Sequence, residues 1–138
     1  MTDITINSTV SIDGNSGQVA HYVPALPAGE EIFKGAACRV YDSKVYLSGS
    51  SITETTGLVS GSMVSSRFDG ISNNSAFQAG EPVTLYGVGS IWGYGTGLMS
   101  GSRLFIGTTS GCLSYTQAFE GDLPVARVLT SESIKVIR

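Results

Sequence analysis

The chain has 138 residues, of which 41% are apolar, and a formal net charge of −3, which fits one compact domain. Only 14% of its residues are charged, against a usual value of about a quarter, and it contains 18 glycines. This composition excludes a disordered chain and lacks the Ala, Glu, Lys and Leu content of a helical bundle. No apolar run approaches the roughly 20 residues of a membrane span, and the first residues do not resemble a secretory signal. We therefore expect a soluble, all-β protein made in the cytosol.

The charge distribution limits the partners. The eight basic residues are scattered from Lys34 to Arg138, and no two are adjacent. Nucleic acids and membrane surfaces both select for clustered Lys and Arg, so we expect neither as a partner. A weakly charged surface is poorly protected against self-association, which leaves oligomerisation open beside a solvated monomer. Cys38 and Cys112 have no CxxC spacing, and we expect two reduced thiols, with Cys38 buried.

The first 28 residues differ from the rest of the chain. Their apolar side chains near the start fall on even positions: Ile4, Ile6, Val10 and Ile12. This period-2 alternation is typical of a strand with one apolar face. A turn signal at residues 13–17 separates it from a second extended segment that contains His21 and Tyr22. The pattern allows two interpretations, an N-terminal hairpin of the core or an arm that pairs with a neighbouring subunit.

From residue 30 onward the sequence predicts short strands joined by glycine turns. We expect strands at residues 36–41, 44–48, 82–89, 103–107, 125–129 and 133–137. Asp42 and Ser43 fit a two-residue hairpin turn between the first two. The polar residues 50–66 predict loop with one short strand near Met63, and no segment has ten or more residues of helical period. The regular turn signals indicate a small barrel or sandwich.

No group of residues in the sequence points to catalysis. The chain has a single histidine, His21, and no Gly-x-Ser-x-Gly motif that would supply a nucleophilic serine beside it. The adjacent Glu30 and Glu31 would point to opposite sides of a strand. One histidine, two distant cysteines and dispersed carboxylates do not make a metal site. The glycine-rich residues 87–97 lack the spacing of a phosphate-binding loop. We therefore expect no enzyme, no metal and no cofactor.

Two aromatic residues lie within that glycine-rich stretch. Glycines flank Tyr94 on both sides, and Gly93 follows Trp92. They could be buried at the end of a barrel, or exposed as anchors for a protein partner, since Trp and Tyr dominate interface hot spots. A third interpretation is a sugar-stacking platform that also uses Tyr115.

Several glycine-strand units then follow in a characteristic order. Phe33, Lys34 and Gly35 precede the strand at 44–48, and residues 79–88 form a Gly-Glu, apolar strand, Gly-Val unit. Residues 98–114 form a Gly, strand, Gly-x-Leu unit, and residues 121–129 form a closing unit with Gly-Asp-x-Pro. In this order and spacing, residues 30–138 resemble bacteriophage head decoration (capsid cement) proteins. The polar stretch at 50–75 departs from the shorter members of that family.

The resemblance implies a small β-barrel or β-tulip-like domain at residues 29–138 with an extended N-terminal arm at residues 1–28. It also implies a structural protein without a catalytic site, located on the exterior of the virion capsid. Such proteins form homotrimers at three-fold and quasi-three-fold positions, where they clamp neighbouring major capsid subunits. On this hypothesis the arm contacts the capsid through Ile4, Ile6, Val10, Ile12, His21 and Tyr22. Trp92 and Tyr94 would contact neighbouring subunits of the trimer. The alternative is a carbohydrate-binding or tail-tip adhesion module.

Overall fold

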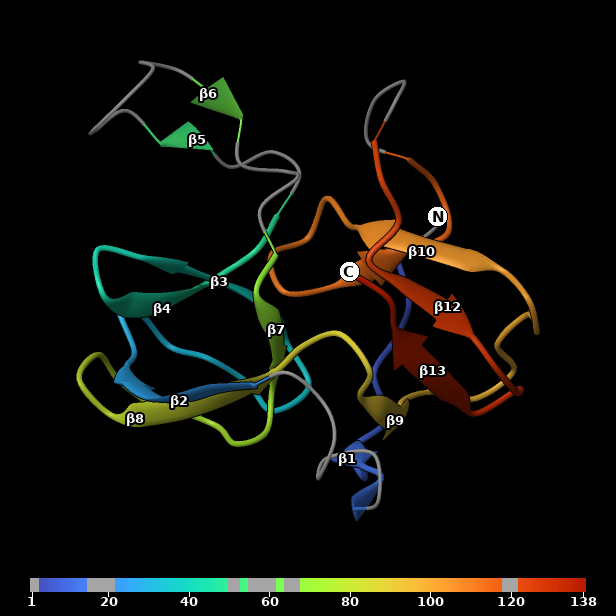
Figure 1. The fold of residues 1–138 in the computed structure, drawn as a ribbon, viewed down its shortest axis with the longest axis horizontal. Helices are drawn as coiled ribbons and strands as arrows, with labels where there is room; N and C mark the ends of the chain where they lie inside the picture. Colours follow the sequence, from blue (N-terminus) through green and yellow to red (C-terminus); the bar gives the residue numbers. More distant parts are fainter. Residues whose placement is uncertain (1–2, 15–21, 50–52, 55–61, 64–67, 118–121) are drawn as a thin grey trace.

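The computed structural model describes residues 3–14, 22–49, 53–54, 62–63, 68–117 and 122–138. In these residues the protein is all-β, with two main antiparallel sheets that lie side by side (Figure 1). This confirms the predicted fold class with very little helix, and neither sheet closes into a complete barrel within the described ranges. The same ranges contain no helix that is long and apolar enough to cross a membrane.

The first sheet has six strands and occupies the right-hand half of Figure 1. In spatial order they are β1 (Ser11–Ile12), β9 (Ile91–Gly93), β13 (Ser133–Val136), β12 (Ala126–Val128), β10 (Arg103–Ile106) and β11 (Leu113–Ser114). Alternate residues of β12 and β13 are buried, which is the pattern of strands with one face on the core. The strands predicted at 103–107, 125–129 and 133–137 are therefore confirmed, each shorter than predicted by one or two residues.

The second sheet has five strands. In spatial order they are β2 (Tyr22–Pro27), β8 (Pro82–Tyr86), β7 (Gly70–Ser72), β3 (Ala37–Tyr41) and β4 (Lys44–Leu47), while β5 (Thr53–Glu54) and β6 (Ser62–Met63) pair separately. The predicted hairpin is confirmed, because Tyr41 pairs with Lys44 and the φ angles of Asp42 and Ser43 are 51° and 61°. Two successive positive φ values define a type I′ turn, which matches the twist of the strands it joins.

The two sheets share a continuous seam. Ala37 and Ile71, from β3 and β7, are fully buried in the hydrophobic core of the six-stranded sheet. The turn between β10 and β11 bonds across the seam, since the Ala37 amide donates to the Gly111 carbonyl at 2.9 Å and the Gly111 amide donates to the Ser48 carbonyl at 2.7 Å. The loop that precedes β11 is thereby held against the ends of β3 and β4.

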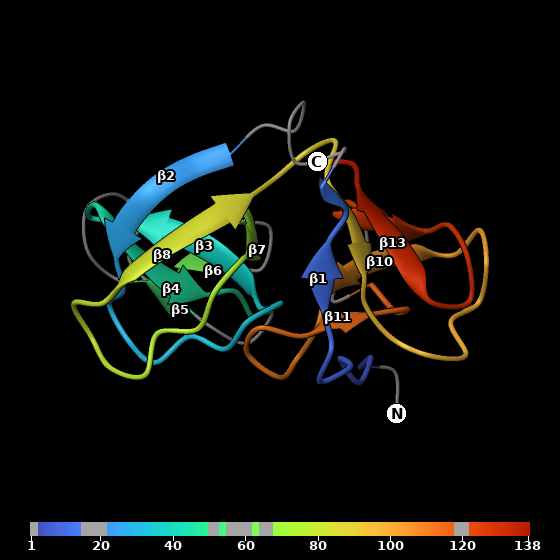
Figure 2. The same cartoon turned by 90° about the horizontal axis from the view of Figure 1, so that it is seen from below.

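The N-terminal segment, defined here as residues 3–12, packs on its own domain. It is not the single strand that its alternation predicts, because the Val10 amide donates to the Asn7 carbonyl at 3.1 Å in a turn and only Ser11–Ile12 form a strand. Its Ile4 amide donates to the carbonyl of Leu113 in β11 at 2.8 Å, and its other end, β1, pairs with β9. β1 and β11 are the two edge strands of the six-stranded sheet, so the segment, which contains β1 and bonds to β11, connects the two edges (Figure 2). Residues 22–27 form β2 of the other sheet. The described part of residues 1–28 therefore belongs to both sheets, which corrects the expectation of a separate arm.

Candidate functional site

An apolar groove lies where the N-terminal segment meets the seam between the two sheets. We call it the seam groove; its volume is about 400 Å³, and it is lined by Asp3, Ile4, Thr5, Ile6, Phe33, Thr109 and Cys112. These residues come from three separate parts of the chain: the N-terminal segment, the turn before β3 and the loop between β10 and β11. A concave, largely apolar surface with a few polar groups is the usual form of a binding site.

Phe33 forms the aromatic wall of the seam groove. Its carbonyl accepts hydrogen bonds from the Ser72 hydroxyl at 2.7 Å and the Ala36 amide at 3.1 Å, which fixes its backbone. Its ring lies against Gly111, where an added Cβ would stand 2.6 Å from the ring Cζ. The side chain nevertheless remains 39% exposed. Phe33 is therefore a preorganised aromatic surface with an open face.

Asp3 supplies the negative charge of the seam groove. Its Oδ2 accepts hydrogen bonds from the Thr109 amide at 3.0 Å and the Thr108 hydroxyl at 3.4 Å, so the carboxylate has a fixed position. Burial, and then the charge of Asp3, raise the pKa of the Cys112 thiol. The thiol is therefore protonated and weakly nucleophilic near neutral pH. With a carboxylate beside apolar side chains, the groove has the chemistry to bind an apolar group next to a positive one.

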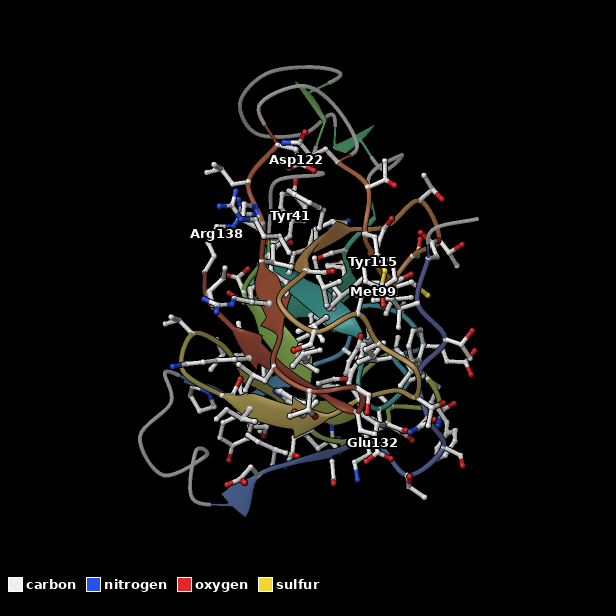
Figure 3. All side chains as sticks on the ribbon, turned by 90° about the vertical axis from the view of Figure 1, so that its right-hand side faces the viewer. Tyr41, Met99, Tyr115, Asp122, Glu132 and Arg138 are labelled. Atoms are coloured by element: carbon white, nitrogen blue, oxygen red, sulfur yellow. The ribbon has the colours of Figure 1, made fainter. Side chains whose placement is uncertain are left out.

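A second, more polar groove lies on the other side of the N-terminal segment. Its volume is about 260 Å³, and it is lined by Asp3, Ile4, Thr5, Asn7, Thr96, Gly97, Leu98 and Tyr115. Tyr115 lies beside the exposed Met99, whose amide donates to the Tyr115 hydroxyl at 3.2 Å (Figure 3). Both grooves are lined by Asp3, Ile4 and Thr5, so the N-terminal segment contributes to each of them. Among the described residues no three His, Cys, Asp or Glu side chains form a group that could hold a metal ion.

Trp92 and Tyr94 do not lie on the surface. Both side chains are fully buried in the core of the six-stranded sheet. The Trp92 indole donates to the Ser90 hydroxyl at 3.0 Å, which satisfies its only polar group inside the core. This corrects the prediction that the pair contacts neighbouring subunits, and it removes two of the three aromatic residues of the expected sugar platform. Their interpretation as buried aromatics is the one that the structure supports.

The residues predicted to contact the capsid are also distributed differently from the expectation. Ile4 and Val10 are buried in their own domain, with exposed fractions of 6% and 4%, and Ile6 and Ile12 are partly buried against the same core. Ile4 and Val10 are therefore unavailable to another protein while the N-terminal segment is in place, which corrects the expectation of a free arm. The backbone of Tyr22 pairs with Tyr86 in β8, and His21 lies outside the described residues.

The sequence alone does not indicate Asp3 or Phe33 as site residues. Phe33 was part of the recognised order of motifs, but no local pattern indicates that its ring lies on Gly111, 78 residues further along the chain. One sequence signal indicates an exposed Phe33: this large aromatic residue stands directly before the Lys34–Gly35 turn and therefore outside the strand that follows. Comparisons with protein-family models, with curated proteins and with solved structures found no match.

Proposed function

We propose that this protein is a structural binding protein that decorates and stabilises the outside of a bacteriophage capsid. It clamps neighbouring major capsid subunits as a homotrimer at three-fold and quasi-three-fold positions. The proposal rests on the resemblance of residues 30–138 to head decoration proteins, and the observation that carries it in three dimensions is the seam groove. That groove offers a fixed aromatic side chain, an apolar floor and a single carboxylate, as a protein-binding surface requires.

The chemistry of the seam groove indicates which capsid segment it would accept. Phe33 and Ile6 present apolar surface, while Asp3 provides the one negative charge among the lining residues. A loop or strand of the capsid protein with an apolar side chain next to a Lys or Arg would match both features. Since such a site recurs on every capsid subunit, many moderate contacts on one shell act together. A protein that binds the assembled shell and not its separated subunits stabilises the shell by mass action.

The test is a pelleting assay with expanded, undecorated heads of the corresponding phage. Purified protein is titrated onto the heads, and the bound copies are counted on a gel after sedimentation. Saturation near one copy per capsid subunit is the expected result, because a trimer at each three-fold position gives that ratio. Absence of binding by folded protein would contradict the proposal.

Two groove variants, one control variant and a comparison at two salt concentrations locate the binding surface. Phe33→Ser should weaken binding by about tenfold or more, because loss of an aromatic anchor costs more than about 1.4 kcal/mol. Leu123→Ser removes an apolar side chain that is 59% exposed outside the groove and should leave binding unchanged. Asp3→Asn keeps an oxygen acceptor for Thr109 but removes the charge, so it should weaken binding at low salt more than at high salt. Equal losses in the Phe33 and Leu123 variants would place the contact elsewhere.

A further inference from the structure

The seat of the N-terminal segment is lined by glycines that come from distant parts of the chain. An added Cβ on Gly107 would lie 2.6 Å from Oδ1 of Asp3, and one on Gly35 would lie 3.0 Å from both Cγ atoms of Val10. An added Cβ on Gly95 would lie 3.3 Å from the carbonyl oxygen of Thr5. Real Cβ contacts are rarely this close. A side chain at any of these three positions would crowd the segment, so the segment fits because all three residues are glycines. The seat is shaped for this particular segment.

The contacts within the seat are those by which a sheet binds an added strand. Main-chain bonds join Ile4 to Leu113 and the Asn7 amide to the Tyr94 carbonyl, both at 2.8 Å, and Ser11 and Ile12 pair with β9. Ile4 and Val10 fill the core, while Thr5 and Thr9 face outward. Main-chain bonds that give affinity and alternate side chains that give specificity are the features of β-strand addition.

We propose that residues 3–12 are exchanged between copies of this chain, so that the seat of one copy binds the N-terminal segment of a second copy. The chain connects the segment to β2 through residues 14–21, and no disulfide holds the segment, because both cysteines are free. The main-chain bonds of the segment and the burial of Ile4 and Val10 are the same whether the segment comes from the same copy or from another. The connection alone favours the same copy, through an effective concentration of about 1 mM. Exchange therefore competes with binding within one copy when the local protein concentration approaches that value, and it dominates above that value or when binding within one copy is blocked.

Two full-length variants with complementary defects test the exchange. The double substitution Ile4→Asp, Val10→Asp places charges on the buried face of the segment and leaves the seat unchanged. Gly95→Val adds a side chain to the seat beside Thr5 and leaves the segment unchanged. Each variant alone should be a monomer of 14.4 kDa by light scattering. An equimolar mixture should contain a complex of one copy of each, and each variant should have buried-tryptophan fluorescence from Trp92 as a check of folding. Two folded variants that remain monomers when mixed would overturn the proposal.

Wild-type protein provides a second test in case one of the variants does not fold. Refolding from urea at about 1 mM should yield oligomers that return to monomers on prolonged dilution to about 1 µM, since the effective concentration sets the balance. Protein that stays monomeric throughout would overturn the proposal. An equal amount of oligomer from the Ile4→Asp, Val10→Asp variant, if folded, would also overturn it, because association would then use another surface. Binding of that variant to undecorated heads without any pairing to Gly95→Val would assign the seat to the capsid protein instead.

Discussion

The hydroxyl of Tyr94 donates a hydrogen bond of 3.1 Å to the carbonyl oxygen of Gly35, across a sequence separation of 59 residues. Tyr94 directly follows β9 in the six-stranded sheet, and Gly35 lies in the turn before β3 in the five-stranded sheet. The bond therefore joins the two sheets at the seam. Gly35 also packs on Val10, so the same turn contacts the N-terminal segment. The seam and the seat of the segment are coupled through this turn.

Replacing Tyr94 with Phe should lower the free energy of unfolding by about 1–3 kcal/mol. The substitution keeps the ring but leaves the Gly35 carbonyl without its buried donor, and an unsatisfied buried polar group costs about that amount. Urea unfolding followed by Trp92 fluorescence measures the loss. Tyr115→Phe is the matched control: its hydroxyl accepts from the exposed amide of Met99, where water can replace it, and it should change stability by less than about 0.5 kcal/mol. Equal effects of the two variants would contradict a buried bond at the seam.

Gly35→Ala should destabilise the protein more than Gly80→Ala. Both glycines have left-handed backbone angles, with φ of 86° and 96°, so each substitution carries a similar backbone cost of about 1–2 kcal/mol. Only Gly35 has a neighbour in reach, since an added Cβ would stand 3.0 Å from Val10 and nothing lies within 4 Å of one on Gly80. The difference in unfolding free energy should be about 1–3 kcal/mol, the usual cost of overpacking. Shortening Val10 to Ala in the Gly35→Ala background should recover part of the difference; additive effects would show that the two residues do not touch.

Ser90→Ala should lower the free energy of unfolding because it removes the hydrogen-bond partner of the buried Trp92 indole. The Ser90 hydroxyl accepts from the Trp92 indole at 3.0 Å and donates to the Gly87 carbonyl at 2.7 Å, so its loss leaves a buried donor and a buried acceptor without this partner. We expect a loss of about 1–3 kcal/mol in urea unfolding. Ser100→Ala removes an exposed hydroxyl that donates to the Leu129 carbonyl and should cost less than about 0.5 kcal/mol. A Ser90 variant as stable as the Ser100 variant would contradict this account.

The parts of the fold that could be predicted from sequence are those set by neighbouring residues. Alternating apolar residues predicted the strands around Ile134 and Val136, and Asp42 with Ser43 predicted the hairpin, because both signals act within a few positions. β7, at Gly70–Ser72, lies outside every strand that the sequence predicts. It is buried despite a polar residue because the Ser72 hydroxyl bonds to the Phe33 carbonyl, a contact between residues 39 apart that no local pattern encodes.

The candidate site depends even more on contacts between distant residues. The alternation in residues 4–12 correctly identified which face is apolar, since Ile4 and Val10 are buried and Thr5 and Thr9 are exposed. It could not identify which sheet that face covers, because a strand of a partner and a strand of the same domain have the same period. The glycines that fit the segment into its own domain lie far along the chain, at Gly95 and Gly107.

Stability should fall as the pH rises above the ordinary thiol pKa, and Cys38 should account for part of the slope. Complete burial, and then the charge of Glu30, raise the pKa of the Cys38 thiol well above its ordinary value of 9.0. Above pH 9.0 the unfolded chain therefore loses a proton that the folded chain keeps, so the folded state loses stability with rising pH. One such thiol gives a slope of about 1.4 kcal/mol per pH unit once the unfolded thiol is ionised. Urea unfolding under reducing conditions at several pH values below 10.0, the ordinary pKa of a tyrosine, measures the slope where Tyr94 contributes less than the thiol.

The thiol variants separate this contribution from general alkaline effects. Cys38→Ala should be less stable at every pH, because it leaves a small cavity, but its stability should decline less steeply above pH 9.0. Cys112→Ala is the matched control, since this thiol is only partly buried and its pKa is raised in the same direction, so its removal should flatten the slope less. If wild type and Cys38→Ala lose stability in parallel above pH 9.0, the buried thiol is not the group that titrates on unfolding. A parallel loss would also mean that the core around β3 admits water before the domain unfolds, because only a hydrated thiol would ionise alike in both states.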